Sequence, residues 1–243
     1  MTKSTYDVDI ICKRLKLGAG VKDALKAKTE GSRFLRETLE REVEERDVRR
    51  ANTFIKNARF PEHKTFADYD FENVQFPEGV AKTYFTECGF ALDRRGLFLY
   101  GSPGTGKTHF AIATGMNACG MNCKTRFWRA YELSEALKLA AYRNETRAFF
   151  SRQKAFGLFI IDEFGFYPTE EAAMRLLFEF FCAVVYGKAG FILTTNLDFQ
   201  EWIQRASEPK MAEAIIDRVV HLSHLVQFEG ESMRLKTSAM LNP

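Results

Sequence analysis

Residues 101–108 constrain the fold more than any other part of this chain. They read Gly-Ser-Pro-Gly-Thr-Gly-Lys-Thr and match the pattern G-x-x-x-x-G-K-S/T. Gly104 and Gly106 let successive backbone N–H groups point into one concavity, and the N-terminus of a following helix favours the same negative charge. The motif follows an apolar segment, 97–100, and opens a helical pattern, 108–118. A strand, a phosphate-binding loop and a helix in this order predict a P-loop fold.

After this loop, short apolar segments alternate with helical patterns. The apolar segments are 124–129, 157–161, 191–195 and 225–228, and 170–186 is one of the helical patterns between them. Segment 157–161 is apolar throughout, which is typical of a strand covered on both faces. Strands that alternate with helices predict a parallel sheet with right-handed crossovers. The expected fold is therefore α/β, a three-layer P-loop NTPase sandwich with a five-stranded parallel sheet.

Residues 1–60 have a different pattern, because their apolar residues recur at helical spacing, as Leu17, Val21 and Leu25 do. They carry 15 Lys and Arg against 10 Asp and Glu, a net charge of +5, whereas the remainder of the chain carries −2. Turn residues and aromatics follow as far as Pro77. We expect three parts: a small all-helical N-terminal domain over 1–60, a linker over 61–77 that packs onto the next domain, and an α/β domain over 78–243.

The composition excludes several classes of protein. Apolar residues make up 46% of the 243 residues and charged residues 28%, as in an ordinary globular protein. No apolar run approaches the ~18 residues of a membrane helix, and no secretory signal is visible at the start. The cysteines number five and are scattered, which favours reduced thiols over disulfides or a zinc site. These features predict a cytoplasmic protein without membrane contact.

Two motifs predict a site for a nucleoside triphosphate and a metal ion. Lys107 is placed to reach the β- and γ-phosphates, and the Thr108 hydroxyl to reach Mg²⁺. Asp162 and Glu163 follow the apolar segment 157–161, at the sheet edge where ligands of open α/β sheets bind. Asp162 would hold Mg²⁺ through water, and Glu163 would orient and deprotonate an attacking water. The second acid favours hydrolysis over transfer to a bound acceptor.

Each of three further side chains has two possible roles. Asn196 follows a predicted strand, where its amide either contacts the γ-phosphate and the water or belongs to a turn. Arg218 and Arg234 either pair with surface carboxylates or stabilise phosphoryl-transfer charge, in the same chain or in a neighbouring subunit. Sequence spacing does not choose between these interpretations.

Together these residues resemble the AAA+ ATPases, and within them the IstB/DnaC-like group. The resemblance is carried by the phosphate loop with its continuation 109–113, by 158–165, by 195–202, by Ile-Ile-Asp-Arg at 215–218 and by Gly-Glu-Ser-Met-Arg-Leu-Lys at 230–236. The phosphate loop is shared by many families, whereas the set that includes residues 230–236 is much more specific. The similarity covers nearly the whole chain and is strongest to the IstB-type helpers of insertion-sequence transposases.

The resemblance implies roles for individual residues. Asn196 becomes the sensor of the γ-phosphate, Arg218 the finger that completes a neighbour's site, and Arg234 a second sensor on the nucleotide. No helical lid domain is expected after Arg234. The nucleotide-binding set is Gly101, Ser102, Pro103, Gly104, Thr105, Gly106, Lys107, Thr108, His109 and Arg234; the catalytic set is Lys107, Glu163, Asn196 and Arg218; the metal ligands are Thr108 and Asp162.

The resemblance also implies cofactors and partners. They are ATP and Mg²⁺, double-stranded DNA bound without strong sequence preference, a transposase, and further copies of the chain in a homo-oligomer, in the bacterial cytoplasm. Two basic surfaces are candidates for the DNA contact, or equally for solvated helix faces. One comprises Lys13, Arg14, Lys16, Lys22, Lys26 and Lys28; the other comprises Arg143, Arg147, Arg152 and Lys154, beside Phe149 and Phe150.

Three alternative functions remain open at this point. A DnaC-like loader of a replicative helicase onto single-stranded DNA would share the ATPase core and differ in its partner. A nucleotide-gated scaffold with negligible turnover would require Glu163 or Arg218 to be missing, and both are present. A small-molecule kinase would require an Arg-bearing lid and an acceptor pocket, and the sequence indicates neither.

Overall fold

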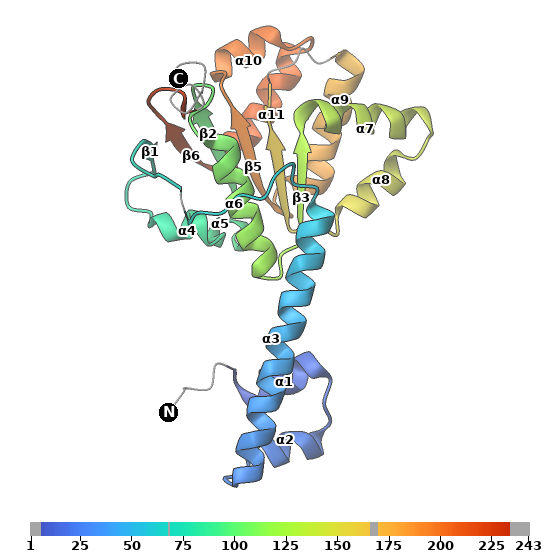
Figure 1. The fold of residues 1–243 in the computed structure, drawn as a ribbon. Coiled ribbons are helices and arrows are strands. Elements are labelled where there is room, and N and C mark those ends of the chain that lie inside the picture. Colours follow the sequence, from blue (N-terminus) through green and yellow to red (C-terminus); the bar gives the residue numbers. More distant parts are fainter. Residues whose placement is uncertain (1–5, 68, 166–169, 234–243) are drawn as a thin grey trace. The chain divides into compact units, whose positions relative to one another are not determined.

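A computed structural model describes residues 6–67, 69–165 and 170–233 (Figure 1). The chain forms two compact units, Met1–Thr53 and Phe54–Pro243. The division falls within helix α3, whereas the sequence places the boundary at residue 60.

The first unit is helical. Its helices are α1 (Val8–Leu15), α2 (Ala19–Lys26) and the first part of α3 (Glu30–Ala58). They pack around a small apolar core that includes Ile11, Leu25 and Val43. Asp7 caps α1, because its carboxylate accepts a hydrogen bond of 2.8 Å from the N–H of Asp9. Helical periodicity in this part of the sequence therefore corresponds to real helices.

The second unit is built on a sheet of six strands in the order β1-β6-β2-β5-β4-β3. The strands are β1 (Val74–Gln75), β2 (Gly96–Gly101), β3 (Thr125–Arg129), β4 (Leu158–Asp162), β5 (Gly190–Thr195) and β6 (Ser223–Phe228). The strands from β2 to β6 coincide with the five apolar segments of the sequence and run parallel to one another. The α/β architecture with a parallel sheet is confirmed.

The sixth strand corrects the predicted strand count of five. β1 pairs antiparallel with β6, with Val74 opposite Phe228 and Gln75 opposite Gln227. It lies inside the segment predicted as a linker, 61–77. Two residues are too short to produce a strand pattern in a sequence, and they pair here because β6 would otherwise leave its outer edge without hydrogen-bond partners.

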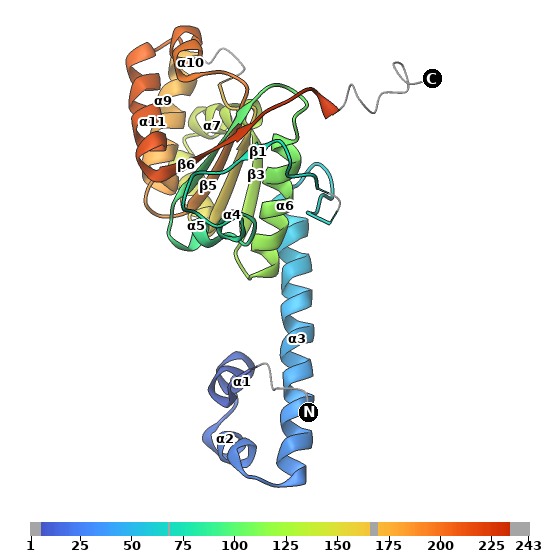
Figure 2. The ribbon, with the colours of Figure 1, turned by 90° about the vertical axis from the view of Figure 1, so that its left-hand side faces the viewer.

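Helices cover both faces of the sheet (Figure 2). One face carries α4 (Lys82–Thr86), α5 (Gly89–Leu92) and α6 (Lys107–Gly120). The other carries α7 (Ala130–Tyr142), α8 (Thr146–Gln153), α9 (Glu171–Phe180), the π-helical turn η1 (Phe181–Val185), α10 (Phe199–Arg205) and α11 (Pro209–Leu222). Alternation along β2 sends Leu97 and Leu99 into one core and Phe98 into the other. The sheet and the helices on its two faces, joined by these two cores, make the three-layer sandwich.

Aromatic side chains on either side of β1 pack onto α6. Ring centres of Phe66, Tyr69 and Phe76 lie 5.2, 6.0 and 6.1 Å from that of Phe110. Aromatic pairs at such distances contribute about 0.5–1.5 kcal/mol each beyond their burial. This segment is therefore held against the helix that follows the P-loop.

The five cysteines are free thiols. Burial raises the pKa of Cys88 to about 12 and that of Cys123 to about 11, so these thiols are neutral at physiological pH. Among the helices that the structure describes, none combines the length and the apolar character required to span a bilayer.

Candidate nucleotide-binding site

The P-loop joins β2 to α6 at the carboxyl edge of the sheet. Gly104 and Gly106 have φ angles of +81° and +97°, a region that residues with a side chain enter only under strain. A β-carbon at Gly104 would lie 2.0 Å from Ser232 Oγ, and one at Gly106 would lie 3.0 Å from the Tyr69 hydroxyl oxygen. The loop therefore needs both glycines, for its backbone conformation and for its close neighbours.

Lys107 is the first residue of α6, and its side chain is held against the loop. Its Nζ donates hydrogen bonds to the carbonyl oxygens of Gly101 at 2.6 Å and Ser102 at 2.7 Å. The Thr105 hydroxyl also donates to the Ser102 carbonyl, at 2.8 Å, while the Ser102 and Pro103 side chains are exposed. A cation fixed among backbone N–H groups at a helix N-terminus fits a chain of phosphates.

Asp162 ends β4, and its carboxylate accepts hydrogen bonds from two hydroxyls. Thr108 Oγ1 donates to Asp162 Oδ1 at 2.9 Å, and Thr194 Oγ1 donates to the same oxygen at 2.6 Å. Asp162 is only 4% exposed, so the two hydroxyls fix the orientation of its carboxylate. Carboxylate and hydroxyl oxygens are the ligand types that Mg²⁺ prefers, and the two predicted metal ligands are thus in contact.

Glu163 is exposed at the same sheet edge. Its backbone is left-handed, with a φ of 58°, which costs a non-glycine residue about 1–3 kcal/mol. Its N–H donates to Thr194 Oγ1 at 3.0 Å. The hydroxyl of Thr194 therefore links the backbone of Glu163 to the carboxylate of Asp162. The backbone strain lies at Glu163, the residue predicted to orient the attacking water.

Two residues of this edge were not predicted from the sequence. Thr194 is the donor to Asp162, and Arg129 ends β3 opposite the end of β4. Hydrogen bonding with Tyr131 is the largest cause of a raised pKa at Arg129; burial opposes the shift, and the charge of Glu163 adds to it more weakly. The signal that would have found both residues is their position, because polar residues at the carboxyl ends of parallel strands meet at one edge.

These side chains surround a cavity of about 440 Å³, which we call the P-loop cavity. Its lining includes Lys107, Thr108, Asp162, Glu163 and Arg129. A loop amide cradle, one buried cation, a hydroxyl–carboxylate pair for a metal and an exposed acid are the groups that a Mg²⁺-bound triphosphate requires. The residues present therefore fit ATP with Mg²⁺.

A second cavity, of about 170 Å³, adjoins the first. The two share Gly106, His109 and Met233 in their linings, and Tyr69 and Asn73 line the second. His109 Nε2 lies 2.8 Å from the carbonyl oxygen of residue 65, and its ring centre lies 4.9 Å from that of Tyr69. Aromatic and amide side chains beside a phosphate site fit the base and ribose of a nucleotide.

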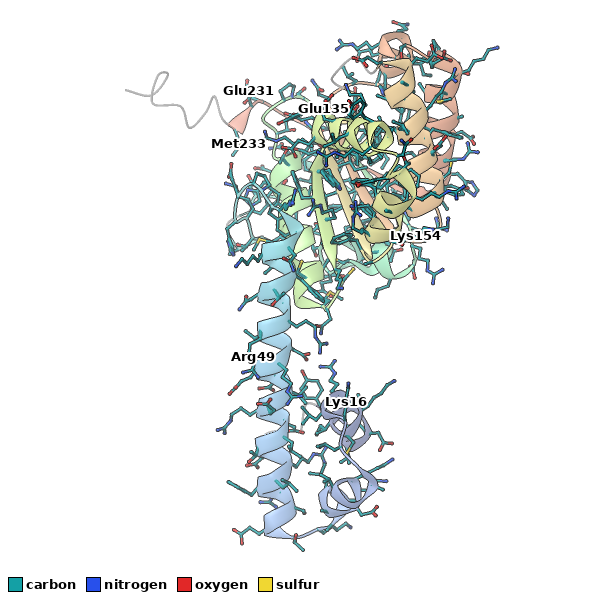
Figure 3. All side chains as sticks on the ribbon, turned by 90° about the vertical axis from the view of Figure 1, so that its right-hand side faces the viewer. Lys16, Arg49, Glu135, Lys154, Glu231 and Met233 are labelled. Carbon is teal, nitrogen blue, oxygen red and sulfur yellow. The ribbon has the colours of Figure 1, made fainter. Side chains whose placement is uncertain are left out.

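The chain that follows β6 contacts the P-loop. The N–H of Met233 donates to the carbonyl oxygen of Gly104 at 3.0 Å, and Ser232 packs against the same glycine. Figure 3 shows Glu231 and Met233 beyond the end of β6. Residues 232 and 233 therefore belong to the site, although only Arg234 of this motif was predicted, and Arg234 lies outside the described residues.

Two predicted catalytic residues do not line the larger cavity as described. Asn196 is half-buried directly after β5. Arg218 lies on α11, where its Nη1 donates to the carbonyl oxygen of Ala214 at 2.8 Å and its guanidinium lies 5.0 Å from the ring centre of Phe178. The geometry therefore gives Arg218 no role in its own chain's cavity, and a role in a neighbour's site stays a prediction.

The fold and this site define an ATP-binding P-loop protein of the AAA+ type. The family model described as IstB-like ATP binding protein matches residues 17–240, and the chain belongs to this family. The chain is 31% identical over 198 residues to the ATP-binding protein of insertion sequence IS232 from Bacillus thuringiensis subsp. berliner, covering 80% of this chain and 78% of that protein. It is 30% identical over 241 residues to the corresponding IS21 protein of Pseudomonas aeruginosa, covering 95% and 89%.

Solved structures of replication proteins are similar in fold. DnaI aligns with a TM-score of 0.56 at 18% identity, covering 69% of this chain and 92% of that one. The DnaC helicase loader gives 0.54 at 18% identity, covering 72% and 98%. DnaA bound to AMPPCP and single-stranded DNA gives 0.53 at 22% identity, covering 70% and 53%. At these identities the likeness concerns the fold alone.

Proposed function

We propose that this protein hydrolyses ATP in a Mg²⁺-dependent reaction, assembles on duplex DNA, and recruits or stimulates a transposase. The observation that carries the proposal is the meeting of Lys107, Thr108, Asp162 and Glu163 around one cavity. The association of its relatives with insertion sequences supports transposition as the setting. Hydrolysis would then reset or disassemble the complex.

Each side chain has a distinct task in this mechanism. The bound Mg²⁺–ATP pair supplies the phosphoanhydride bond that water cleaves. Loop N–H groups and Lys107 bind the phosphate oxygens and offset their charge, while Thr108 and Asp162 hold the metal. Glu163 orients the attacking water and accepts its proton on the carboxylate, so that ADP and phosphate leave the site.

Assembly into a homo-oligomer would complete the site. Arg218 lies on α11 beside Phe178 and does not line its own chain's cavity. A guanidinium supplied by a neighbouring subunit can stabilise the charge of the transferred phosphoryl group. This arrangement would make hydrolysis depend on subunits being adjacent, and Asn196 would report the γ-phosphate to the rest of the chain.

A helicase loader is the second candidate, because DnaI and the DnaC helicase loader are similar in fold. The relatives that match most of this chain are insertion-sequence proteins, which favours transposition.

Co-purification distinguishes the two functions. We expect the full chain with ATP to retain the transposase of its own insertion sequence and not a replicative helicase, and retention of the helicase alone would overturn the assignment.

Glu163→Gln tests the hydrolytic mechanism. The amide keeps the size of the side chain but cannot accept the proton, so ATP binding should persist while turnover falls by about 10²–10⁴-fold. ATPase assays and sedimentation with duplex DNA measure both effects, and the variant should accumulate as a DNA-bound assembly. Glu213→Gln, an exposed change on α11, is the matched control and should behave as wild type. Normal turnover by Glu163→Gln would place the base elsewhere.

A further inference from the structure

A third cavity, rich in cations, lies at the start of β3. It has a volume of about 380 Å³, and its lining comes from the end of α3, the turn that follows it, the start of β3 and the end of α8. The basic residues in its lining are Lys56, Arg59, Lys124, Arg126 and Arg152. No acidic residue is among the described residues that line it. We call it the basic cavity.

Arg126 is the buried member of this set. It is 9% exposed, and its guanidinium lies 4.4 Å from the ring centre of Trp128 and 5.9 Å from that of Phe156. Its Nη1 donates to the carbonyl oxygen of Asn57 at 3.2 Å, while its buried Nε has no hydrogen-bond partner within the described chain. An unmet buried donor costs about 1–3 kcal/mol, more when charged, so this guanidinium is held at a cost to stability.

The charge of the basic cavity is not neutralised by the chain itself. None of its five basic residues forms an ion pair with a carboxylate in the part of the chain that the structure describes. Burial, and next the charge of Arg59, lower the pKa of Arg126 to about 10, with Glu132 opposing the shift. Arg126 therefore remains charged at neutral pH. Like charges gathered without counter-charges destabilise a fold, and an anion would reverse that effect.

Arg59 and Lys124 shape the wall of this cavity. Arg59 directly follows the last residue of α3 in a left-handed conformation, with a φ of 62°, which is a common way for a helix to end. The Nζ of Lys124 lies 5.8 Å from the ring centre of Phe54. The chain therefore turns at Arg59 into the lining of the basic cavity.

The composition of the basic cavity indicates which anion it takes. It has no glycine loop, so it lacks the amide cradle of a nucleotide site. Its cations come from three separate segments, and four of the five are exposed around the buried Arg126. Spread cations without a carboxylate among them suit a row of phosphates. A nucleic-acid backbone fits this arrangement better than a single small anion.

We propose that the basic cavity binds phosphates of the duplex DNA backbone, with Arg126 as its fixed centre and Lys124 and Arg152 as contacts at its rim. This inference rests on the proposed function, because it names where DNA meets the ATPase unit. It also separates Arg152 from the other basic residues of the α8 region, which do not line the cavity as described. The P-loop cavity and the basic cavity have no lining residue in common, so both can be filled together.

The test uses the full chain with saturating ATP and a fluorescein-labelled duplex. Lys124→Gln and Arg152→Gln change exposed side chains and leave the buried Arg126 in place. Each should weaken binding by about fivefold at moderate salt and lower the slope of log affinity against log salt by roughly 0.9 for each phosphate that is no longer neutralised. Lys154→Gln is the matched control, because Lys154 lies at the same end of α8 (Figure 3) outside the cavity lining.

The outcomes separate this inference from the function on which it rests. If wild type fails to bind duplex DNA, the proposed function itself fails. If wild type binds and the Lys124→Gln, Arg152→Gln double variant binds equally well with the same salt slope, only the basic cavity is overturned. An equal loss in Lys154→Gln would assign the contact to the whole α8 surface and overturn the cavity as well. If the double variant altered only the sedimentation of DNA-free protein, the partner would be a second copy of the chain.

Discussion

The P-loop cavity and the basic cavity lie at opposite ends of β3 and bind anions by different means. Arg129 ends the strand in the P-loop cavity, and Arg126 near its start lines the basic cavity, about 10 Å away. The P-loop cavity relies mainly on backbone N–H groups, with Lys107 and Arg129 beside them and a carboxylate for a metal. The basic cavity relies on side-chain charge alone. A site made from backbone fixes one ligand, whereas a site made from spread cations accepts any stretch of a polyanion.

The largest expected effect on ligand affinity comes from removing the buried lysine of the P-loop cavity. Lys107→Ala should weaken ATP binding by about 100-fold, because one ammonium group offsets much of the phosphate charge there. Calorimetry with ATP and Mg²⁺ measures the change. Lys124→Gln removes a cation from the other cavity and should leave ATP affinity unchanged. If both variants lost ATP affinity equally, the two cavities would not be independent.

A backbone change should affect only the P-loop cavity. Gly104→Ala forces a β-carbon onto a residue with a φ of +81° and toward Ser232, so ATP affinity should fall by about tenfold. Fluorescence titration with a labelled ATP analogue measures the loss. Adding Ser232→Gly removes the close contact but not the backbone strain, so recovery should be partial. Full recovery would mean that crowding by Ser232, and not the backbone conformation, sets the effect.

Local sequence pattern explains which strands of the sheet could be predicted. The strands from β2 to β6 were predicted because each is a buried apolar run flanked by helical patterns. β1 was not, since Val74 and Gln75 are ordered by the free edge of β6, a partner more than a hundred residues away in the chain. Local pattern finds elements that bury their own side chains, and it misses elements that exist only to complete another strand.

The residues of the candidate site also divide into those that a local motif predicts and those that only the fold brings together. Lys107, Thr108, Asp162 and Glu163 were predicted because contiguous motifs carry them, and the structure brings them to one cavity. Thr194 was missed because its role depends on the register between neighbouring strands. Of the basic cavity only Arg152 was among the candidates for a DNA contact, since its residues come from three separate segments and only the fold brings them together.

The smallest expected effect is the response of DNA binding to pH, which sharpens the distinction between the two cavities. The pKa of Arg126 is lowered by burial to about 10, so its positive charge is complete at neutral pH and is lost only as pH rises toward that value. No histidine is among the described residues that line the basic cavity, whereas His109 lines the P-loop cavity. Duplex affinity, measured by anisotropy at constant salt, should therefore change less than about twofold between about pH 6.5 and 8.5. A steep fall across that range would show that a group other than these arginines and lysines controls the DNA contact.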